Sequence, residues 1–312
     1  MRRWLRWLWV SLIVLMVLAV AFIATVYATQ GRWLPRAIVS ATNAGRVIGV
    51  YDRTVPGVAR QMRVEVGPPQ AVLSVWVVDP AQGESLGVRG TVLVLHGVHD
   101  RKASMLGMGK RLAQEGYRAV LVDLRGHGES SGEWLTYGVV ESRDLSQVLD
   151  ALGREKLLVA PVSAVGISYG GATAIMLAGH DERVQAVVAV APFCSMRDEV
   201  YNYIRYHRGI PRFVISDRQI EESIHAAGKL ADFDPAAASP VDAIRRTKAR
   251  VLIMHGEADS KIPFEHSRRL HAAAPDRSEL IIVAGEDHDS LSCDRDGAVA
   301  RETLTWLSRS EP

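Results

Sequence analysis

Short, fully apolar runs alternate with longer stretches of helical spacing through most of the chain. The apolar runs occupy residues 91–95, 119–122, 162–165, 186–190, 251–254 and 280–283. Strands that are buried on both faces have this pattern. Helical spacing fills the intervals at 105–114, 139–152, 169–179, 265–274 and 298–307. The alternation predicts the α/β fold class, with a mostly parallel sheet and helices on both of its faces.

Two further strands precede this region. Val64 and Val66 alternate with polar residues, and a second β-rich run, 72–78, follows the turn sequence Gly67-Pro68-Pro69. This spacing predicts a hairpin at the edge of the sheet. The sequence thus predicts an eight-stranded sheet within a domain of residues 61–312, preceded by a linker or a first helical arm at 37–60.

Residues 193–240 separate two consecutive strands by far more than one crossover helix needs. Insertions of that length are usually functional. The segment contains three tyrosines, three phenylalanines and several basic residues. We expect a helical lid over the site, and the alternative is two structural helices packed on the edge of the domain.

The first 36 residues form a separate unit. Arg2, Arg3 and Arg6 precede an uncharged apolar stretch, residues 7–31. As a helix this stretch is about 37 Å long, enough to cross a hydrocarbon layer of roughly 30 Å. We expect a membrane anchor with the N-terminus in the cytoplasm and the catalytic domain on the extracytoplasmic side. The alternative is a signal peptide cleaved after Val26-Tyr27-Ala28, which would release a secreted protein.

Composition narrows the classes of function. Five of the 37 Lys and Arg residues lie in residues 1–36, which contain no acid, so the rest carries 32 basic against 35 acidic residues, a net charge of −3. This mildly acidic domain has no basic face for nucleic acid. The two cysteines, Cys194 and Cys293, suffice for neither a zinc cluster nor a disulfide scaffold, although an exported domain could form one bridge between them.

The sequence Gly166-Ile167-Ser168-Tyr169-Gly170 lies between an apolar run and an alanine-rich helical pattern. A strand that turns directly into a helix strains its central residue, and flanking glycines leave room for the close crossing. The motif therefore predicts a nucleophile elbow that presents the Ser168 hydroxyl. The alternative is an ordinary glycine-rich turn whose serine caps the helix.

The residues after the later strands decide between these interpretations. In an open parallel sheet, ligands bind beyond the carboxyl ends of the strands, and Ser168, Asp259 and His288 all follow predicted strands. A serine nucleophile needs a histidine base, which in turn needs a carboxylate to fix its tautomer. We expect these three residues to form a catalytic triad. Glu257 is the fallback acid, and Asp287 flanks the histidine on a segment whose neighbouring side chains should point apart.

The chain resembles the α/β-hydrolase superfamily over about residues 60–310. The resemblance rests on the His96-Gly97 turn, the stretch 123–130, the elbow, the turn at 255–259 and the His288 loop. More narrowly, the chain looks like bacterial membrane-anchored members of the serine aminopeptidase and lysophospholipase-like branch. The resemblance implies a Ser-His-Asp hydrolase without metal or organic cofactor. The residue after the nucleophile, Tyr169, would supply one backbone amide of the oxyanion hole, and the family pattern puts the second on Val98.

Three functions are compatible with these residues. The first is hydrolysis of a small or lipid-like carboxylic ester, favoured by the membrane segment and the aromatic insertion. The second is aminopeptidase activity on short peptides, which would need a lid carboxylate, Glu199, Glu221 or Glu222, to hold the substrate amine. The third is a noncatalytic, membrane-tethered binding protein of the same fold, for which an intact triad is unnecessary.

Overall fold

The computed structural model describes residues 2–43, 54–80, 87–295 and 297–309. All eight predicted strands form one sheet in the order β1-β2-β4-β3-β5-β6-β7-β8. Their bounds are β1 Arg60–Val66, β2 Ala71–Val78, β3 Thr91–Leu95, β4 Arg118–Val122, β5 Val162–Ile167, β6 Val184–Val190, β7 Arg250–Gly256 and β8 Ser278–Val283. The hairpin β1–β2 lies at one edge as predicted, and it joins the sheet through antiparallel pairing of β2 with β4. The remaining pairs are parallel.

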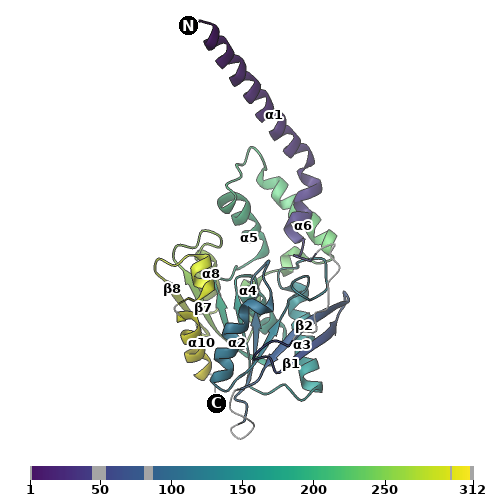
Figure 1. The fold of residues 1–312 in the computed structure, drawn as a ribbon, viewed down its shortest axis with the longest axis vertical. Helices are drawn as coiled ribbons and strands as arrows, with labels where there is room; N and C mark the ends of the chain where they lie inside the picture. Colours follow the sequence, from purple (N-terminus) through teal and green to yellow (C-terminus); the bar gives the residue numbers. More distant parts are fainter. Residues whose placement is uncertain (1, 44–53, 81–86, 296, 310–312) are drawn as a thin grey trace.

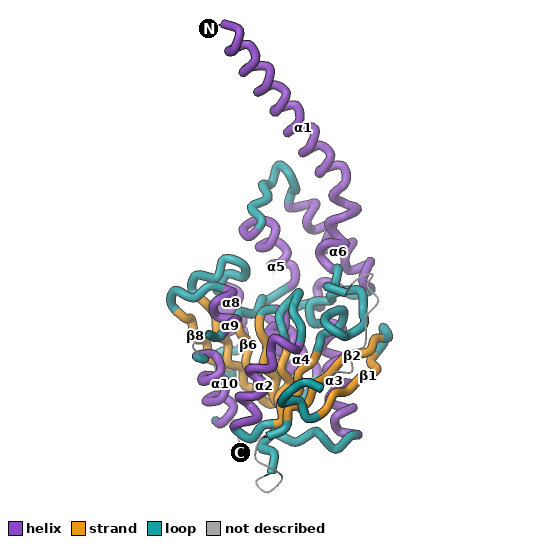
Figure 2. The backbone as a smooth tube through the Cα atoms, viewed as in Figure 1, coloured by secondary structure: helices purple, strands orange, loops and turns teal. Residues whose placement is uncertain are grey.

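Helices cover both faces of the sheet, which confirms the predicted architecture (Figures 1 and 2). One face packs against α3 (Val139–Arg154), α4 (Tyr169–His180), α7 (Pro240–Arg246) and α8 (Glu265–Ala273). The opposite face packs against α2 (Leu106–Gln114), α9 (His288–Cys293) and α10 (Ala298–Ser308). A short turn of 3-10 helix, η1 (Lys102–Met105), precedes α2. Because the central strands are apolar on both sides, each face needs its own helical cover.

The insertion after β6 is helical. It consists of α5 (Met196–Asn202), the π-helical turn η2 (Tyr203–His207), α6 (Asp217–Ala231) and η3 (Pro235–Ala237), and it leads into α7. Its apolar side chains form a third hydrophobic cluster, separate from the two on the sheet faces. This cluster lies above the carboxyl ends of the parallel strands, where a lid is expected (Figure 1).

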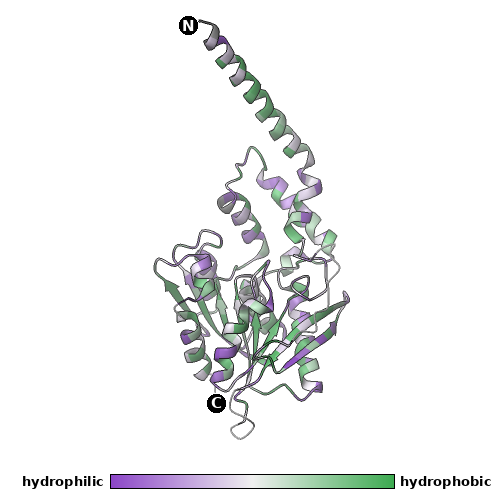
Figure 3. Ribbon diagram, in the orientation of Figure 1, coloured by the Kyte–Doolittle hydropathy of each residue, from purple (hydrophilic) through white to green (hydrophobic). Residues whose placement is uncertain are grey.

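The first helix, α1 (Arg2–Val39), is longer than the predicted unit of residues 1–36. Its N-terminal part extends away from the domain as a strongly apolar rod (Figure 3). Its last turns enter the lid cluster, because Leu34, Ile38 and Val39 share one face of the helix and pack against α5 and α6. Part of the expected linker is thus a helical arm. Residues 44–53 lie outside the described residues.

One described helix is long and apolar enough to cross a membrane, over Arg6–Val26. Length and composition alone support this, and a signal sequence would pass the same test. None of this span is buried against the other residues that the structure describes.

Candidate active site

The turn from β5 into α4 places Ser168 in a conformation that few residues adopt. Its φ of 54° and ψ of −116° lie in a strained region. Glycine is required on both sides, because a Cβ on Gly166 would lie 2.2 Å from the Gly170 carbonyl oxygen, and a Cβ on Gly170 would lie 2.5 Å from the Leu95 carbonyl oxygen. The motif therefore forms the sharp strand-to-helix turn that the sequence predicts, with Ser168 at its apex.

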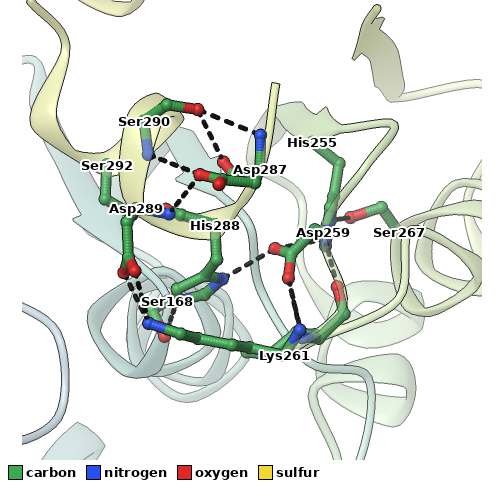
Figure 4. A network of polar contacts seen from close by, with 11 residues as sticks. Ser168, His255, Asp259, Lys261, Ser267, Asp287, His288, Asp289, Ser290 and Ser292 are labelled. Carbon is green, nitrogen blue, oxygen red and sulfur yellow. Dashed lines mark hydrogen bonds and ion pairs between the residues drawn. The ribbon is translucent and has the colours of Figure 1, made fainter. Parts of the chain in front are cut away.

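Ser168, His288 and Asp259 come together in one chain of polar contacts (Figure 4). The Ser168 Oγ lies 3.1 Å from His288 Nε2, and His288 Nδ1 lies 2.7 Å from Asp259 Oδ2. When the Nδ1–H group of His288 donates a hydrogen bond to the carboxylate, Nε2 carries no proton and can accept the proton of the serine hydroxyl. The three residues come from the ends of β5, β7 and β8, which the fold brings to one edge.

Several groups hold the Asp259 carboxylate in place. Its Oδ1 accepts hydrogen bonds from the backbone N–H groups of Lys261 and Ile262, both at 2.9 Å. His255 Nε2 lies 3.2 Å from Oδ2. Burial alone would raise the pKa of Asp259, but the hydrogen bonds from His255 and His288 outweigh burial and hold this pKa below its usual range. The carboxylate is therefore ionised when the histidine needs it.

The other acids considered for this role lie elsewhere. Glu257 is exposed. Asp287 caps α9 by accepting from the N–H groups of Asp289 and Ser290, and the Asp289 carboxylate lies 2.6 Å from Lys261 Nζ. His288 is the first residue of α9 rather than part of an extended segment. The His288 ring contacts Asp259 rather than Asp287, because the Asp287 carboxylate caps the N-terminus of α9.

A cavity of about 430 Å³ opens beside Ser168. Val98 and Tyr169, whose backbone amides are the expected oxyanion donors, line it together with the nucleophile. Most of its wall is apolar or aromatic and comes from α1, the lid and the loops after the strands; these residues include Trp33, Leu34, Ala37, Ile38, Leu135, Tyr137, Phe193, Val200, Tyr203, Ile204, Ile210 and Ile262.

Sequence reasoning did not find the contribution of α1 to this wall. The only signal was the apolar spacing of Leu34 and Ile38, which continues past the membrane-type stretch with helical period. Where that face would pack depends on the lid, whose fold the sequence pattern left open.

The three lid acids have different surroundings. Glu199 lines the cavity, and its Oε2 is buried without a hydrogen-bond partner among the described residues. Glu221 accepts from the Tyr201 hydroxyl and pairs with Arg197 on the lid surface. Glu222 pairs with Arg218 and is exposed. Burial, and then the negative charge of Asp259, raise the pKa of Glu199 well above its usual value.

Two histidines in the loops after β3 and β4 contact backbone groups. His96 Nε2 accepts from the Leu124 N–H at 3.0 Å, and His127 Nδ1 lies 2.9 Å from the Arg125 carbonyl oxygen. His99 lines the cavity and is solvent-exposed. The side chain of His207 lies outside the described residues.

Cys194 is buried and Cys293 is exposed, and both are free thiols, so the bridge that the sequence left open does not form in this structure. Within the described ranges, no group of three or more His, Cys, Asp and Glu side chains could hold a metal ion.

Comparisons with known proteins agree with this fold. The chain is 25% identical to the uncharacterised protein YfhR of Escherichia coli K12 over 73% of both chains. It is 27% identical to human protein ABHD12B over 65% of this chain and 56% of that protein. Among solved structures, the Pyrococcus furiosus esterase Pf2001 superposes with a TM-score of 0.64 at 19% identity, covering 86% of this chain and 97% of the esterase. A puromycin-hydrolysing peptidase from Mycobacterium tuberculosis gives a TM-score of 0.60 at 18% identity, covering 84% of this chain and 41% of the peptidase.

The similarity to these solved structures establishes the fold. The similar structures include both esterases and peptidases. The expected superfamily is confirmed, whereas the narrower serine aminopeptidase and lysophospholipase-like branch stays a prediction. Residues 108–310, well over half of the chain, match the prolyl oligopeptidase family. The chain therefore belongs to the prolyl oligopeptidase family of α/β-fold hydrolases.

Proposed function

We propose that this protein hydrolyses a carboxylic ester, or a related acyl bond, of a small or lipid-like substrate through Ser168, His288 and Asp259. The observation that carries the proposal is the continuous Ser168–His288–Asp259 contact chain at the base of an apolar cavity. A purely structural serine would not need a histidine acceptor at 3.1 Å and an ionised carboxylate behind it.

In this mechanism, Ser168 Oγ attacks the substrate carbonyl carbon while His288 Nε2 takes the hydroxyl proton. The backbone N–H groups of Tyr169 and Val98 stabilise the resulting oxyanion, and His288 then protonates the leaving group. Water activated by the same histidine hydrolyses the acyl-enzyme and regenerates Ser168. No metal or organic cofactor takes part in these steps.

The cavity supports the choice of an apolar acyl group. Its lining is mostly hydrocarbon and aromatic, so it stabilises a chain removed from water by about 0.8 kcal/mol per buried methylene. Membrane anchoring through residues 7–31, with the domain on the extracytoplasmic side, would hold the site beside a lipid surface. The support for the anchor is the apolar segment Arg6–Val26, and cleavage after Ala28 is the alternative fate.

A second candidate function is the removal of N-terminal residues from short peptides. The prolyl oligopeptidase family match and the position of Glu199 in the cavity favour it. A noncatalytic binding role is the third candidate, and only the absence of serine reactivity would support it.

The test is labelling of the purified full-length protein with a fluorophosphonate probe, followed by a chain-length series of p-nitrophenyl esters. We expect labelling and ester hydrolysis in the wild type and in Ser308→Ala, an exposed control serine, and neither in Ser168→Ala. Equal labelling of the Ser168→Ala variant would refute the assignment of the nucleophile. Aminoacyl p-nitroanilides are measured in parallel as peptidase substrates. A higher kcat/KM for these compounds than for the esters would favour the peptidase function.

A further inference from the structure

Glu199 differs from its acidic neighbours in the lid because no described residue forms an ion pair with it. Asp198 accepts from the Ser195 hydroxyl and pairs with Arg269 at 2.7 Å. Asp217 on α6 pairs with Arg205 at 2.8 Å. By contrast, no ion pair to Glu199 occurs among the described residues, and its Oε2 is buried without a partner. An unpaired buried carboxyl is costly, so its retention in a cavity wall points to a ligand.

The charges around Glu199 favour its neutral form. The charge that acts on it most directly is the carboxylate of Asp259, which makes a second negative charge unfavourable. The other titratable or charged side chains lining the cavity are Tyr137, Tyr169, Tyr203, His99 and Arg208. Arg208 is engaged with the Tyr203 hydroxyl at 2.6 Å rather than with Glu199. Burial and Asp259 together raise the pKa of Glu199 well above its usual value, which favours the protonated carboxyl.

A protonated carboxyl group is a hydrogen-bond donor. We propose that Glu199 donates its proton in a hydrogen bond to an uncharged oxygen, such as a hydroxyl or ether, within the acyl chain of the substrate. The proposal rests on the proposed function, because Ser168 and Glu199 line one cavity and the acyl chain bound to Ser168 would pass Glu199. An oxygen acceptor also suits Arg208, whereas an ammonium group would share the cavity with that guanidinium.

The consequence is selectivity within an apolar pocket. A site built to hydrogen-bond one polar substrate atom discriminates strongly against the analogue that lacks it, because the polar group of the site is then left unpaired. Glu199 would therefore distinguish oxygen-bearing acyl chains from plain hydrocarbon chains of the same length.

The experiment compares p-nitrophenyl hexanoate with analogues in which an ether oxygen replaces the methylene at position 3, 4 or 5, and with the 6-ammonio ester. Four full-length proteins are measured: wild type, Glu199→Gln, Glu199→Leu and the control Glu222→Gln, which changes an exposed lid acid. The quantity is the preference, defined as the kcat/KM ratio of each substituted ester to hexanoate.

We expect the wild type and Glu222→Gln to prefer at least one oxygen-bearing ester. Glu199→Leu should lose about tenfold or more of that preference, and Glu199→Gln should keep it within about threefold, because the amide retains a donor. The wild-type preference should also fall as rising pH ionises Glu199, whereas that of Glu199→Gln should not depend on pH. This second readout stands even if Glu199→Leu does not fold.

Three results would overturn the inference: no preference for any oxygen-bearing ester in the wild type, an undiminished preference in folded Glu199→Leu, or a wild-type preference for the ammonio ester that Glu199→Gln abolishes. The last result would show that Glu199 acts as an ionised carboxylate that binds the ammonium group of the substrate. Hydrolysis of plain hexanoate that is lost in Ser168→Ala tests the proposed function separately, so the two ideas can fail independently.

Discussion

Lys102 is the most fully buried lysine or arginine in the described part of the domain, and replacing it should severely destabilise the fold. Its side chain is 2% exposed, and its Nζ lies 2.6 Å from Asp123 Oδ2 and 2.7 Å from Glu129 Oε2. The ammonium also lies 4.6 Å from the centre of the Trp76 ring. One cation thus compensates two carboxylates in the loop that follows β4.

The substitution Lys102→Met keeps the length of the side chain and removes its charge. Asp123 would retain the backbone N–H groups of residues 102 and 129 as donors. No positive charge would remain beside two carboxylates, one of them 1% exposed. Breaking a buried ion pair in this way typically costs about 3–5 kcal/mol, so we expect a loss of that size in the free energy of unfolding.

The matched control is Lys248→Met. Lys248 also forms an ion pair, at 3.1 Å from Glu182, but the two side chains are 80% and 81% exposed. Exposed pairs contribute about 0–1 kcal/mol, so this variant should unfold close to the wild type. Both variants are compared by urea unfolding of the purified protein. A loss below about 1 kcal/mol for Lys102→Met, or equal losses in the two variants, would refute the reasoning that the buried cation is required.

Three further predictions concern other buried groups. Tyr169→Phe should lower the free energy of unfolding by about 2 kcal/mol in a denaturant titration, because the Tyr137 backbone N–H loses its acceptor and the buried Glu141 carboxylate loses one of its donors. Glu141 would keep its hydrogen bonds from Thr136 and Gly138, and an unchanged stability would show that water replaces the hydroxyl. Burial lowers the pKa of His127 and of His266 to about 4, below the 6.5 of the unfolded chain, so the folded state binds fewer protons. Their contribution to stability is complete above pH 6.5 and is lost as the pH falls towards 4. NMR titration of the two rings in the folded protein tests this, because the melting temperature also includes the opposite effect of carboxyls whose pKa is raised, such as Glu199; titration of either ring near pH 6.5 would contradict the prediction. The exposed Cys293 should react with one equivalent of maleimide in the native protein, and a second thiol should react only after denaturation.

The sheet could be predicted because its strands are buried on both faces and therefore read as uninterrupted apolar runs. The run 186–190 and the strand β6, Val184–Val190, differ only at the start. The proposed triad could be predicted for a related reason. Parallel strands end at one edge, so Ser168, Asp259 and His288 had to approach one another once each was known to follow a strand.

The lid could not be predicted to the same depth. Glu199, Glu221 and Glu222 were equivalent in the sequence, since nothing local records which acid has a cation beside it. In the fold, Arg197 of the first turn of α5 pairs with Glu221 across the lid, whereas Glu199, from the same turn, lines the cavity. Pairing between separate helices is a tertiary property, and hydrophobic periodicity carries no information about it.

The helix α1 has an exposed N-terminal part and a C-terminal part that packs on the domain, and the sequence alone did not reveal where one ends and the other begins. The apolar span Arg6–Val26 is not buried against any part of the chain that the structure describes. Among the described side chains of the helix, Gln30 is the first that is buried, and it lies beside Ser223 of α6. The possible cleavage site after Ala28 falls between these parts. Cleavage there would remove the span and leave Trp33 and Ile38 in the cavity wall. Membrane attachment and an intact cavity are therefore separable, and the mass of the mature protein decides the first without bearing on the second.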